Sequence, residues 1–251
     1  MRVTTRQIAQ MKRRSERIVM VTAYDALSAG AAERAGIPMV LVGDSLGQVV
    51  LGYDSTVPVS MDGMVAHTAA VTRCASSPLI VADLPFLSYQ CGEDLAVAAA
   101  GRLLKESPAA AVKLEGAEPE VVDVINRLVR MGIPVMGHLG LTPQSVHQMG
   151  YRRQAVDAVS QERLQAQAAI LERCGCFAMV LEHVPAELAG RVRRSLAIPV
   201  IGIGAGDDCD GQVRVTADLL GLTPRQPPFS PALVNGRQLF TDALQSWVSG
   251  I

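Results

Sequence analysis

Three acidic side chains, Asp44, Asp83 and Glu115, each stand at the end of a short apolar run of the sequence. If these runs are parallel strands of one barrel, their carboxyl ends share a rim and the three carboxylates converge there. Carboxylates in a confined site repel one another unless a cation lies among them. Oxygen ligands favour a hard ion such as Mg²⁺, which keeps waters and takes further ligands from a substrate. Each residue alone could cap a helix, but the three together predict a magnesium site.

Lys113 lies two positions before Glu115, so both side chains leave the same face of a strand while Val112 and Leu114 face the surrounding helices. A lysine that points into a barrel requires an anionic partner. That partner is either Glu115 or the carboxylate of a substrate. A Schiff-base role is disfavoured, because a carboxylate this close would hold the amine protonated.

Glu182 ends another apolar run, Met179 to Leu181. An apolar setting raises the pKa of a carboxyl toward the range in which it works as a general base, although Glu182 could instead form a salt bridge with a neighbouring helix. His138 ends the preceding run, next to Gly137. It could orient another group by hydrogen bonding, contact a metal-linked water, or be a satisfied core histidine.

A glycine-rich run, G-I-G-A-G at residues 202–206, follows a further apolar stretch. In a barrel of eight β-α units, the loops after the last two strands often bind phosphate. This run lacks the spacing of a dinucleotide fingerprint, and no Walker lysine follows it. Its glycines could also serve only to let a ligand approach the backbone.

Apolar runs rich in Val and Ile alternate with segments of helical period, which is typical of β-α units around a parallel sheet. Eight strands are predicted: Ile18–Ala23, Met39–Gly43, Leu79–Ala82, Ala110–Leu114, Pro134–Gly137, Phe177–Leu181, Val200–Ile203 and Val213–Thr216. An open doubly wound sheet is the alternative, but ionisable residues at nearly every strand end favour a closed ring. The length of 251 residues is typical of one such barrel, so the prediction is a single (β/α)₈ domain over residues 1–251.

Helix punctuation separates the strands. Ser60 is placed as an N-cap before a helix over residues 64–73, Pro119 opens a second helix, and a third is predicted over residues 161–173. Four prolines between residues 224 and 231 then make an extended connector to a final helix over residues 236–248. This C-terminal tail helix is expected to pack on the barrel or on a neighbouring subunit.

The amino-acid composition indicates which kind of binding partner and which cellular location to expect. Lys plus Arg total 23 against 24 Asp plus Glu, so the net charge of −1 favours a small-molecule partner and neither nucleic acid nor membrane. The five cysteines are irregularly spaced and lack the C-x-x-C pairs of a structural zinc site, which is typical of reduced cytosolic thiols. The basic N-terminus has no apolar signal region, and no run of about 18 apolar residues occurs. A soluble cytoplasmic protein is predicted.

The motifs resemble those of the ketopantoate hydroxymethyltransferase family from about Thr4 to Gly221. Each motif is short, but their order and spacing are specific. They are T-A-Y-D (22–25), L-V-G-D-S-L-G (41–47), D-S-T-V-P-V (54–59), A-D-L-P-F (82–86), V-K-L-E-G (112–116), G-H-L-G-L-T-P-Q-S (137–145), L-E-H-V-P (181–185), I-P-V-I-G-I-G-A-G (198–206) and D-G-Q (210–212).

The resemblance implies a Mg²⁺-dependent barrel that transfers a one-carbon unit from 5,10-methylenetetrahydrofolate to 3-methyl-2-oxobutanoate on the route to pantothenate. It implies that Asp44 and Asp83 hold the metal directly, that Glu115 completes its shell, and that Glu182 accepts a proton. Contacts to the oxo acid are implied for Asp44, Ser45, Asp83 and Lys113. The family resemblance also implies a cytoplasmic homo-oligomer, often of ten subunits. Departures at residues 150–155 and 228–230 bear on folate affinity and subunit packing.

Two other classes of protein share part of this pattern. A Mg²⁺-dependent oxo-acid lyase or mutase of the phosphoenolpyruvate mutase and isocitrate lyase type would act without folate, but its expected K-K-C-G-H loop is absent from the sequence. A non-catalytic sensor of oxo acid or metal is the other class. The complete set of ionisable residues speaks against it, because a pseudoenzyme is expected to have lost at least one of them.

Overall fold

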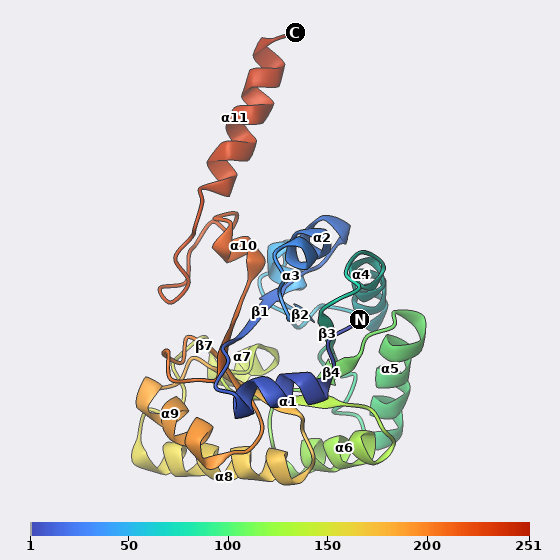
Figure 1. The fold of residues 1–251 in the computed structure, drawn as a ribbon, viewed down its shortest axis with the longest axis vertical. Coiled ribbons are helices and arrows are strands. Elements are labelled where there is room, and N and C mark those ends of the chain that lie inside the picture. The colour runs from blue at the N-terminus through green and yellow to red at the C-terminus, as the bar shows by residue number, and fades with distance from the viewer. Residues whose placement is uncertain (1) are drawn as a thin grey trace.

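Eight parallel strands pair in chain order and close into a barrel in the computed structural model, which describes residues 2–251 (Figure 1). The strands are β1 (Ile18–Thr22), β2 (Met39–Val42), β3 (Leu79–Asp83), β4 (Ala111–Lys113), β5 (Val135–Gly140), β6 (Ala178–Glu182), β7 (Val200–Ile203) and β8 (Gly211–Arg214). Because β8 pairs with β1, the sheet has no free edge. The predicted (β/α)₈ barrel is confirmed.

Helices cover the outside of the barrel between successive strands (Figure 1). The longer ones are α2 (Ala26–Arg34), α4 (Met61–Cys74), α5 (Glu93–Glu106), α6 (Pro119–Arg130), α8 (Ala158–Arg173) and α9 (Ala186–Ser195). Short helical turns follow the carboxyl ends of strands: α3 (Leu46–Val49), the 3₁₀ turn η1 (Pro143–Ser145), α7 (Val146–Met149) and α10 (Thr216–Leu219). At the opposite end lies α1 (Thr5–Arg13), whose Ile8 is fully buried in the barrel interior.

Capping residues determine where the helices begin. Ser60 caps α4 as predicted and accepts a hydrogen bond from the backbone of Gly63 at 3.1 Å. α8 begins earlier than predicted because Asp157 caps it, and the Asp157 Oδ1 accepts from the backbone of Ser160 at 3.0 Å. None of the helices within residues 2–251 is both long and apolar enough to span a membrane.

Side chains of the strands alternate between the barrel interior and the surrounding helices. Val112 and Leu114 pack in the layer between sheet and helices, so Lys113 points into the barrel, as predicted. Apolar side chains fill the interior below it: Ile18, Met20, Met39, Leu41, Leu79, Val81, Ala111, Met136, Ala178, Val180, Ile201 and Val213. The polar side chains therefore collect at the carboxyl ends of the strands.

β5 extends beyond its predicted end at Gly137 and pairs with β6 as far as Gly140 and Glu182. Gly140 has a φ of +96°, and a Cβ atom there would collide with the backbone carbonyl of Glu182. Glycine lets the two strands approach this closely. The backbone N–H of Leu141 then donates to the Glu182 carbonyl at 2.8 Å. The close approach holds the strand end that carries Glu182.

β8 lies two residues before its predicted position, at Gly211–Arg214 instead of Val213–Thr216. A Cβ atom at Gly211 would collide with the backbone carbonyl of Ile18 in β1, so glycine is required where the barrel closes. The residues after Arg214 lead into α10. The prediction followed the apolar valines and therefore placed the strand too late.

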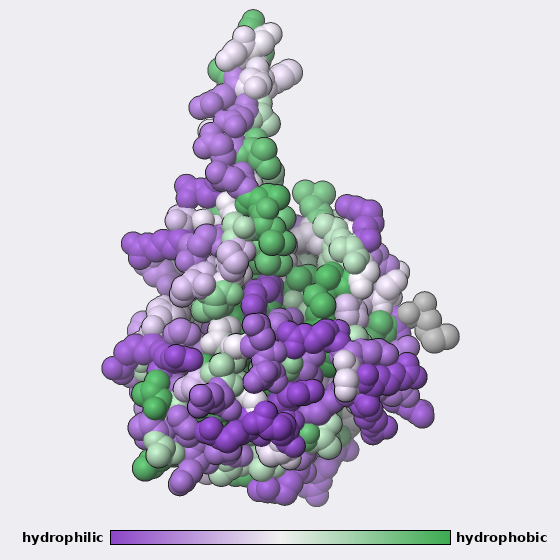
Figure 2. All heavy atoms as spheres, turned by 60° about the vertical axis from the view of Figure 1, so that its left-hand side comes forward, coloured by the Kyte–Doolittle hydropathy of each residue, from purple (hydrophilic) through white to green (hydrophobic). Residues whose placement is uncertain are grey.

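The C-terminal segment has two parts. Residues 222–229 pass along the mouth of the barrel, where Leu222 and Phe229 line a cavity. The predicted final helix is present as α11 (Gly236–Ser249), and it projects away from the barrel (Figure 1). The expectation that it packs on its own barrel is wrong, because its apolar side chains are exposed (Figure 2). They are Leu239, Phe240, Leu244, Trp247 and Val248.

Candidate active site

A cavity of about 500 Å³ opens at the carboxyl ends of the strands. It lies at the end of the barrel where enzymes of this architecture carry their active sites. Every side chain selected from the sequence lines it: Asp44, Ser45, Asp83, Lys113, Glu115, His138 and Glu182. The structure therefore brings the seven residues to one place, and their individual roles stay predictions.

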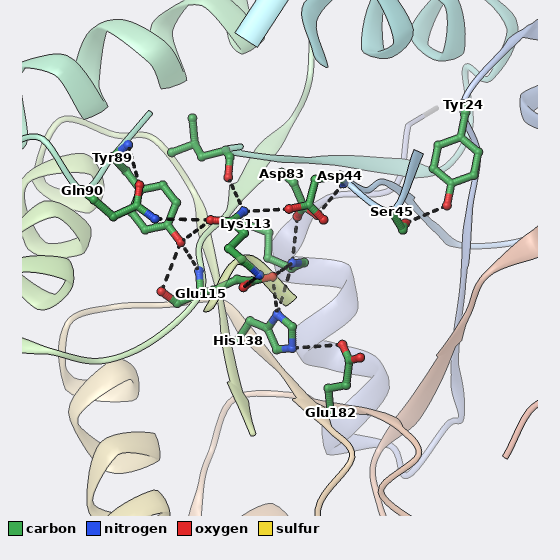
Figure 3. Close-up of polar contacts among 12 residues, drawn as sticks. Tyr24, Asp44, Ser45, Asp83, Tyr89, Gln90, Lys113, Glu115, His138 and Glu182 are labelled. Carbon is green, nitrogen blue, oxygen red and sulfur yellow. Dashed lines mark hydrogen bonds and ion pairs between the residues drawn. The ribbon is translucent and has the colours of Figure 1, made fainter. Parts of the chain in front are cut away.

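Strand alternation and one tight turn bring the acidic groups together. Asp83 ends β3 and points inward, whereas Asp44 follows β2 in a loop. The backbone N–H of Asp44 donates to Asp83 Oδ2 at 3.0 Å (Figure 3). A Cβ atom at the intervening Gly43 would come within 2.9 Å of Ser45 Oγ, so glycine permits this turn. Ser45 Oγ is also hydrogen-bonded to the hydroxyl of Tyr24 at 2.8 Å.

Lys113 lies at the centre of the charged cluster (Figure 3). Its Nζ atom is 2.9 Å from Asp83 Oδ1 and 4.0 Å from Glu115 Oε1. Burial lowers the pKa of Lys113, but the attraction of Asp83, Glu115 and Asp44 outweighs burial and raises it. The amine is therefore held protonated, which agrees with the argument against a Schiff base. Its nearest carboxylate is Asp83, a partner that the sequence analysis had not considered.

His138 joins two carboxylates. Its Nδ1 atom is 3.4 Å from Glu115 Oε1, and its Nε2 atom is 3.3 Å from Glu182 Oε2 (Figure 3). Burial and the charge of Lys113 lower the pKa of His138, yet the contacts with the two carboxylates raise it to about 9. The two carboxylates therefore favour the imidazolium at neutral pH, against the ammonium of Lys113, whose Nζ atom lies 3.3 Å from Nδ1. Of the three roles open to it, this geometry favours orientation of Glu182.

The cluster contains more negative than positive charge. Burial, followed by repulsion from Asp83 and Glu115, raises the pKa of Asp44 well above its usual range. Burial also raises the pKa of Asp83, even though Lys113 counteracts it. Burial raises the pKa of Glu115, but its contacts with His138, Lys113 and the backbone of Gln144 together outweigh burial and lower it. When ionised, the four carboxylates of this cluster face two cations, Lys113 and His138, which leaves two negative charges of the cluster without a counterion.

This charge excess fits a divalent cation. Asp83 Oδ1 is buried and receives no hydrogen bond from residues 2–251 beyond its ion pair with Lys113, so it can accept a metal ion. Across the same residues, no three acidic, His or Cys side chains form a preformed metal cluster. Mg²⁺ commonly uses one or two carboxylates and completes its shell with water and substrate. Asp44 and Asp83 therefore suit Mg²⁺ better than a metal that needs a closed protein cage.

Two neutral residues organise the site, and the sequence analysis missed them. Gln144 donates from Nε2 to Asp44 Oδ2 at 2.8 Å and from its backbone N–H to Glu115 Oε2 at 3.0 Å. The Tyr89 hydroxyl donates to Gln144 Oε1 at 2.8 Å, which fixes the direction of the amide. Both side chains are uncharged, so a pattern of charged residues in the sequence does not point to them. The available signal was the position of Gln144 in the run G-H-L-G-L-T-P-Q-S.

The glycine-rich run serves the packing of the chain itself. A Cβ atom at Gly204 would lie 2.9 Å from the ring of Phe229, and one at Gly202 would lie 2.9 Å from Cys209 Sγ. A Cβ atom at Gly206 would collide with Ala186. The glycines therefore make room for neighbouring side chains, and Phe229 reaches the cavity wall because Gly204 lacks a side chain.

Proteins of similar sequence and proteins of similar fold match nearly the whole chain. The 3-methyl-2-oxobutanoate hydroxymethyltransferase of Synechococcus sp. (strain CC9605) is 70% identical, covering 96% of this chain and 91% of its own. The protein of the same name from Synechococcus sp. (strain CC9902) is 67% identical, with the same coverage. The crystal structure of 2,3-dimethylmalate lyase, a member of the phosphoenolpyruvate mutase/isocitrate lyase superfamily, shares the fold with a TM-score of 0.67 and 17% identity, covering 100% of this chain and 90% of its own.

The match to one protein family extends over nearly the whole sequence. Residues 2–251 match the family described as ketopantoate hydroxymethyltransferase. This match includes every side chain of the cavity and also α11, which lies outside the region of motif resemblance. The chain belongs to the ketopantoate hydroxymethyltransferase family.

Proposed function

We propose that the protein transfers a hydroxymethyl group from 5,10-methylenetetrahydrofolate to 3-methyl-2-oxobutanoate, giving 2-dehydropantoate, with Mg²⁺ as its bound cation. The names of the relatives support the acceptor and the reaction. The observation that carries the proposal is the arrangement of the cavity, where Asp44, Asp83 and Lys113 lie together and Glu182 faces them across His138. One water molecule is consumed, because it supplies the oxygen of the new hydroxyl group.

The charged end of the cavity is suited to gripping an oxo acid. Asp44 and Asp83 would hold Mg²⁺, with Glu115 completing its surroundings. The bound ion would act as a Lewis acid that stabilises the negative charge developing on the oxo acid. Lys113 and Ser45 would bind the substrate carboxylate, and the protonated amine supplies the stronger of these two contacts.

Glu182 is the group best placed to remove the proton from carbon 3. Its side chain is 19% exposed, compared with 3% for Asp83 and Glu115, so it reaches into the open part of the cavity. His138 holds the opposite side of the carboxylate and limits its rotation. The C–H electron pair becomes the carbon–carbon double bond of an enolate as the carbonyl pair moves onto oxygen. Water breaks the two C–N bonds of the folate methylene group, which releases tetrahydrofolate and leaves the one-carbon unit as formaldehyde. Carbon 3 attacks the formaldehyde carbon, and the resulting alkoxide takes the proton from Glu182. Placing both reactants at one rim contributes the positional part of the rate acceleration.

Isotope exchange tests the first step by itself. The protein is incubated with 3-methyl-2-oxobutanoate in D₂O, with and without Mg²⁺ and folate, and loss of the carbon 3 proton is followed by NMR. We expect exchange that requires Mg²⁺ and does not require folate. Absence of exchange under every condition would overturn the enolate mechanism. Exchange at the same rate with and without Mg²⁺ would overturn the metal assignment.

The cellular setting and assembly follow from the family resemblance. We infer a cytoplasmic homo-oligomer, with ten subunits as the expected number. The exposed apolar side chains of α11 support an assembly, because such a surface is costly in water. Light scattering coupled to size-exclusion chromatography measures the number of subunits, and a monomer at micromolar concentration would contradict the inference.

A further inference from the structure

The cavity is larger than an oxo acid requires. Its volume of about 500 Å³ is typical of a site for a drug-sized ligand, whereas the oxo acid is small and its charged groups occupy one end. The remainder of the wall comes from α3, β8, α10, the connector and the loop after α7, and it is mainly apolar apart from Asp218, Thr223 and Arg225. Its side chains include Val49, Tyr151, Val215, Leu222 and Phe229.

One carboxylate lies in this apolar part. Asp218 of α10 lines the cavity and is only 7% exposed. Its Oδ1 atom accepts a hydrogen bond from Thr223 Oγ1 at 2.8 Å, and no cationic side chain within residues 2–251 forms an ion pair with it. Burial raises its pKa. A buried carboxylate with one hydrogen bond is costly, and the enolate chemistry gives it no task.

We propose that Asp218 binds the 2-aminopyrimidinone edge of the reduced pterin ring of the folate. That edge presents two adjacent N–H donors, on N3 and on the 2-amino group. A carboxylate accepts such a pair in parallel, as it does from a guanidinium group, and it has free lone pairs beyond the one used by Thr223. The flat body of the pterin would lie against Phe229 and the aliphatic wall.

This inference deepens the proposed function and rests on it, because a folate is expected here only if it delivers the one-carbon unit. It also accounts for the connector. Residues 222–229 close one side of the cavity, and the hydrogen bond between Thr223 and Asp218 ties the start of that segment to α10. The competing explanation is that Asp218 serves only this tether.

Paired variants separate recognition from tethering. Asp218→Asn keeps an oxygen for Thr223 but turns an N–H₂ group toward the donors of the pterin. Thr223→Val removes the tether and keeps the carboxylate. We expect Asp218→Asn to weaken tetrahydrofolate binding, measured by calorimetry, and to raise the KM for 5,10-methylenetetrahydrofolate about 100-fold, whereas Thr223→Val changes both less than about 10-fold. Equal losses in the two variants would assign Asp218 to the tether and overturn the proposal.

A change in the ligand tests the same contact without a variant that could misfold. The wild-type protein is expected to bind 2-desamino-tetrahydrofolate about 10-fold to 100-fold more weakly than tetrahydrofolate. Asp218→Asn should lose most of this discrimination. Equal affinity of the wild type for the two folates would overturn the proposal.

Carbon 3 exchange without folate distinguishes the two levels of inference. It reports on the oxo-acid end alone, so a wild type that exchanges but shows no preference for the 2-amino group retains the proposed function and loses the role of Asp218. A wild type that shows no exchange and binds no folate loses the proposed function itself. Exchange in Asp218→Asn also checks that the variant is folded.

Discussion

The two ends of the barrel both bury ion pairs, but they balance charge differently. At the amino end, the single carboxylate of Asp210 lies 2.9 Å from Lys12 Nζ and 2.8 Å from Arg193 Nε, and it accepts a third bond from the backbone of Val200 at 2.9 Å. At the carboxyl end, four carboxylates share Lys113 and one histidine. The Asp210 carboxylate is fully paired within the chain, whereas the carboxylates at the mouth outnumber the cations that face them.

The two clusters differ in role: the charges around Asp210 stabilise the fold, whereas those at the mouth can bind a ligand. The Asp210 cluster joins α1, α9 and the loop before β8, so it ties the N-terminal helix to the last β-α units of the barrel. Its carboxylate is satisfied and has no capacity for a ligand. In the mouth, burial raises the pKa of both Asp44 and Asp83, and repulsion from neighbouring carboxylates adds to it, so folding holds these groups where a charge is disfavoured. Uncompensated buried charge of this kind is typical of a binding or catalytic site.

The largest effect is expected from removal of the proposed general base, Glu182. Glu182→Gln keeps the size of the side chain, so binding of the oxo acid should persist while carbon 3 exchange falls about 10³-fold. NMR exchange and calorimetric binding measure the two effects separately. Glu187→Gln, at an exposed position of α9, is the matched control and should leave both unchanged. An exchanging Glu182→Gln enzyme would mean that another group removes the proton.

Removing the structural carboxylate should affect stability instead. Asp210→Ala leaves Lys12 and Arg193 without their shared partner and is expected to cost about 3–5 kcal/mol of unfolding free energy. Urea denaturation measures this loss, while exchange per folded molecule stays near the wild-type rate. The surface pair Arg102–Glu106, at 3.0 Å, provides the control, because Glu106→Ala should leave the unfolding free energy close to that of the wild type. Equal losses in both variants would contradict the assigned difference.

Protonation of His138 links the mouth to pH. Because folding raises its pKa from 6.5 to about 9, the imidazolium contributes stability that is fully present below pH 6.5 and is lost as pH rises through about 9. The contribution is about 3 kcal/mol in the metal-free protein. Urea titrations at pH 6 and pH 9, compared between the wild type and His138→Gln, isolate this dependence. A variant with the same pH slope as the wild type would rule His138 out as its source.

The smallest expected effect is a gain in stability. Asp44→Asn removes one of the repelling charges and keeps an oxygen that can accept from Gln144, so the metal-free protein should become slightly more stable. The variant should also lose most of the increase in melting temperature that Mg²⁺ gives the wild type. A destabilised variant that still responds fully to Mg²⁺ would contradict both the charge excess and the metal role of Asp44.

The sequence predicted what depends on strand period and charge. Because side chains alternate along a strand, the sequence alone assigned Lys113 and Glu115 to the face that points away from the helices. Gln144 could not be found in this way, because a neutral amide in a loop gives no signal until its partners are known. The start of β8 and the direction of α11 depend on contacts that close the barrel or leave it, and local pattern does not contain these.

Gly140 has a consequence for mutational tolerance. The position of the proposed base depends on an atom that is missing, because any Cβ at this glycine would collide with the backbone of Glu182. Even alanine, the smallest replacement, would have to move the strand end that carries the base, and the φ of +96° adds strain for every other residue. No conservative substitution exists at this site, so a change far smaller than the loss of a charge would disturb the chemistry as directly.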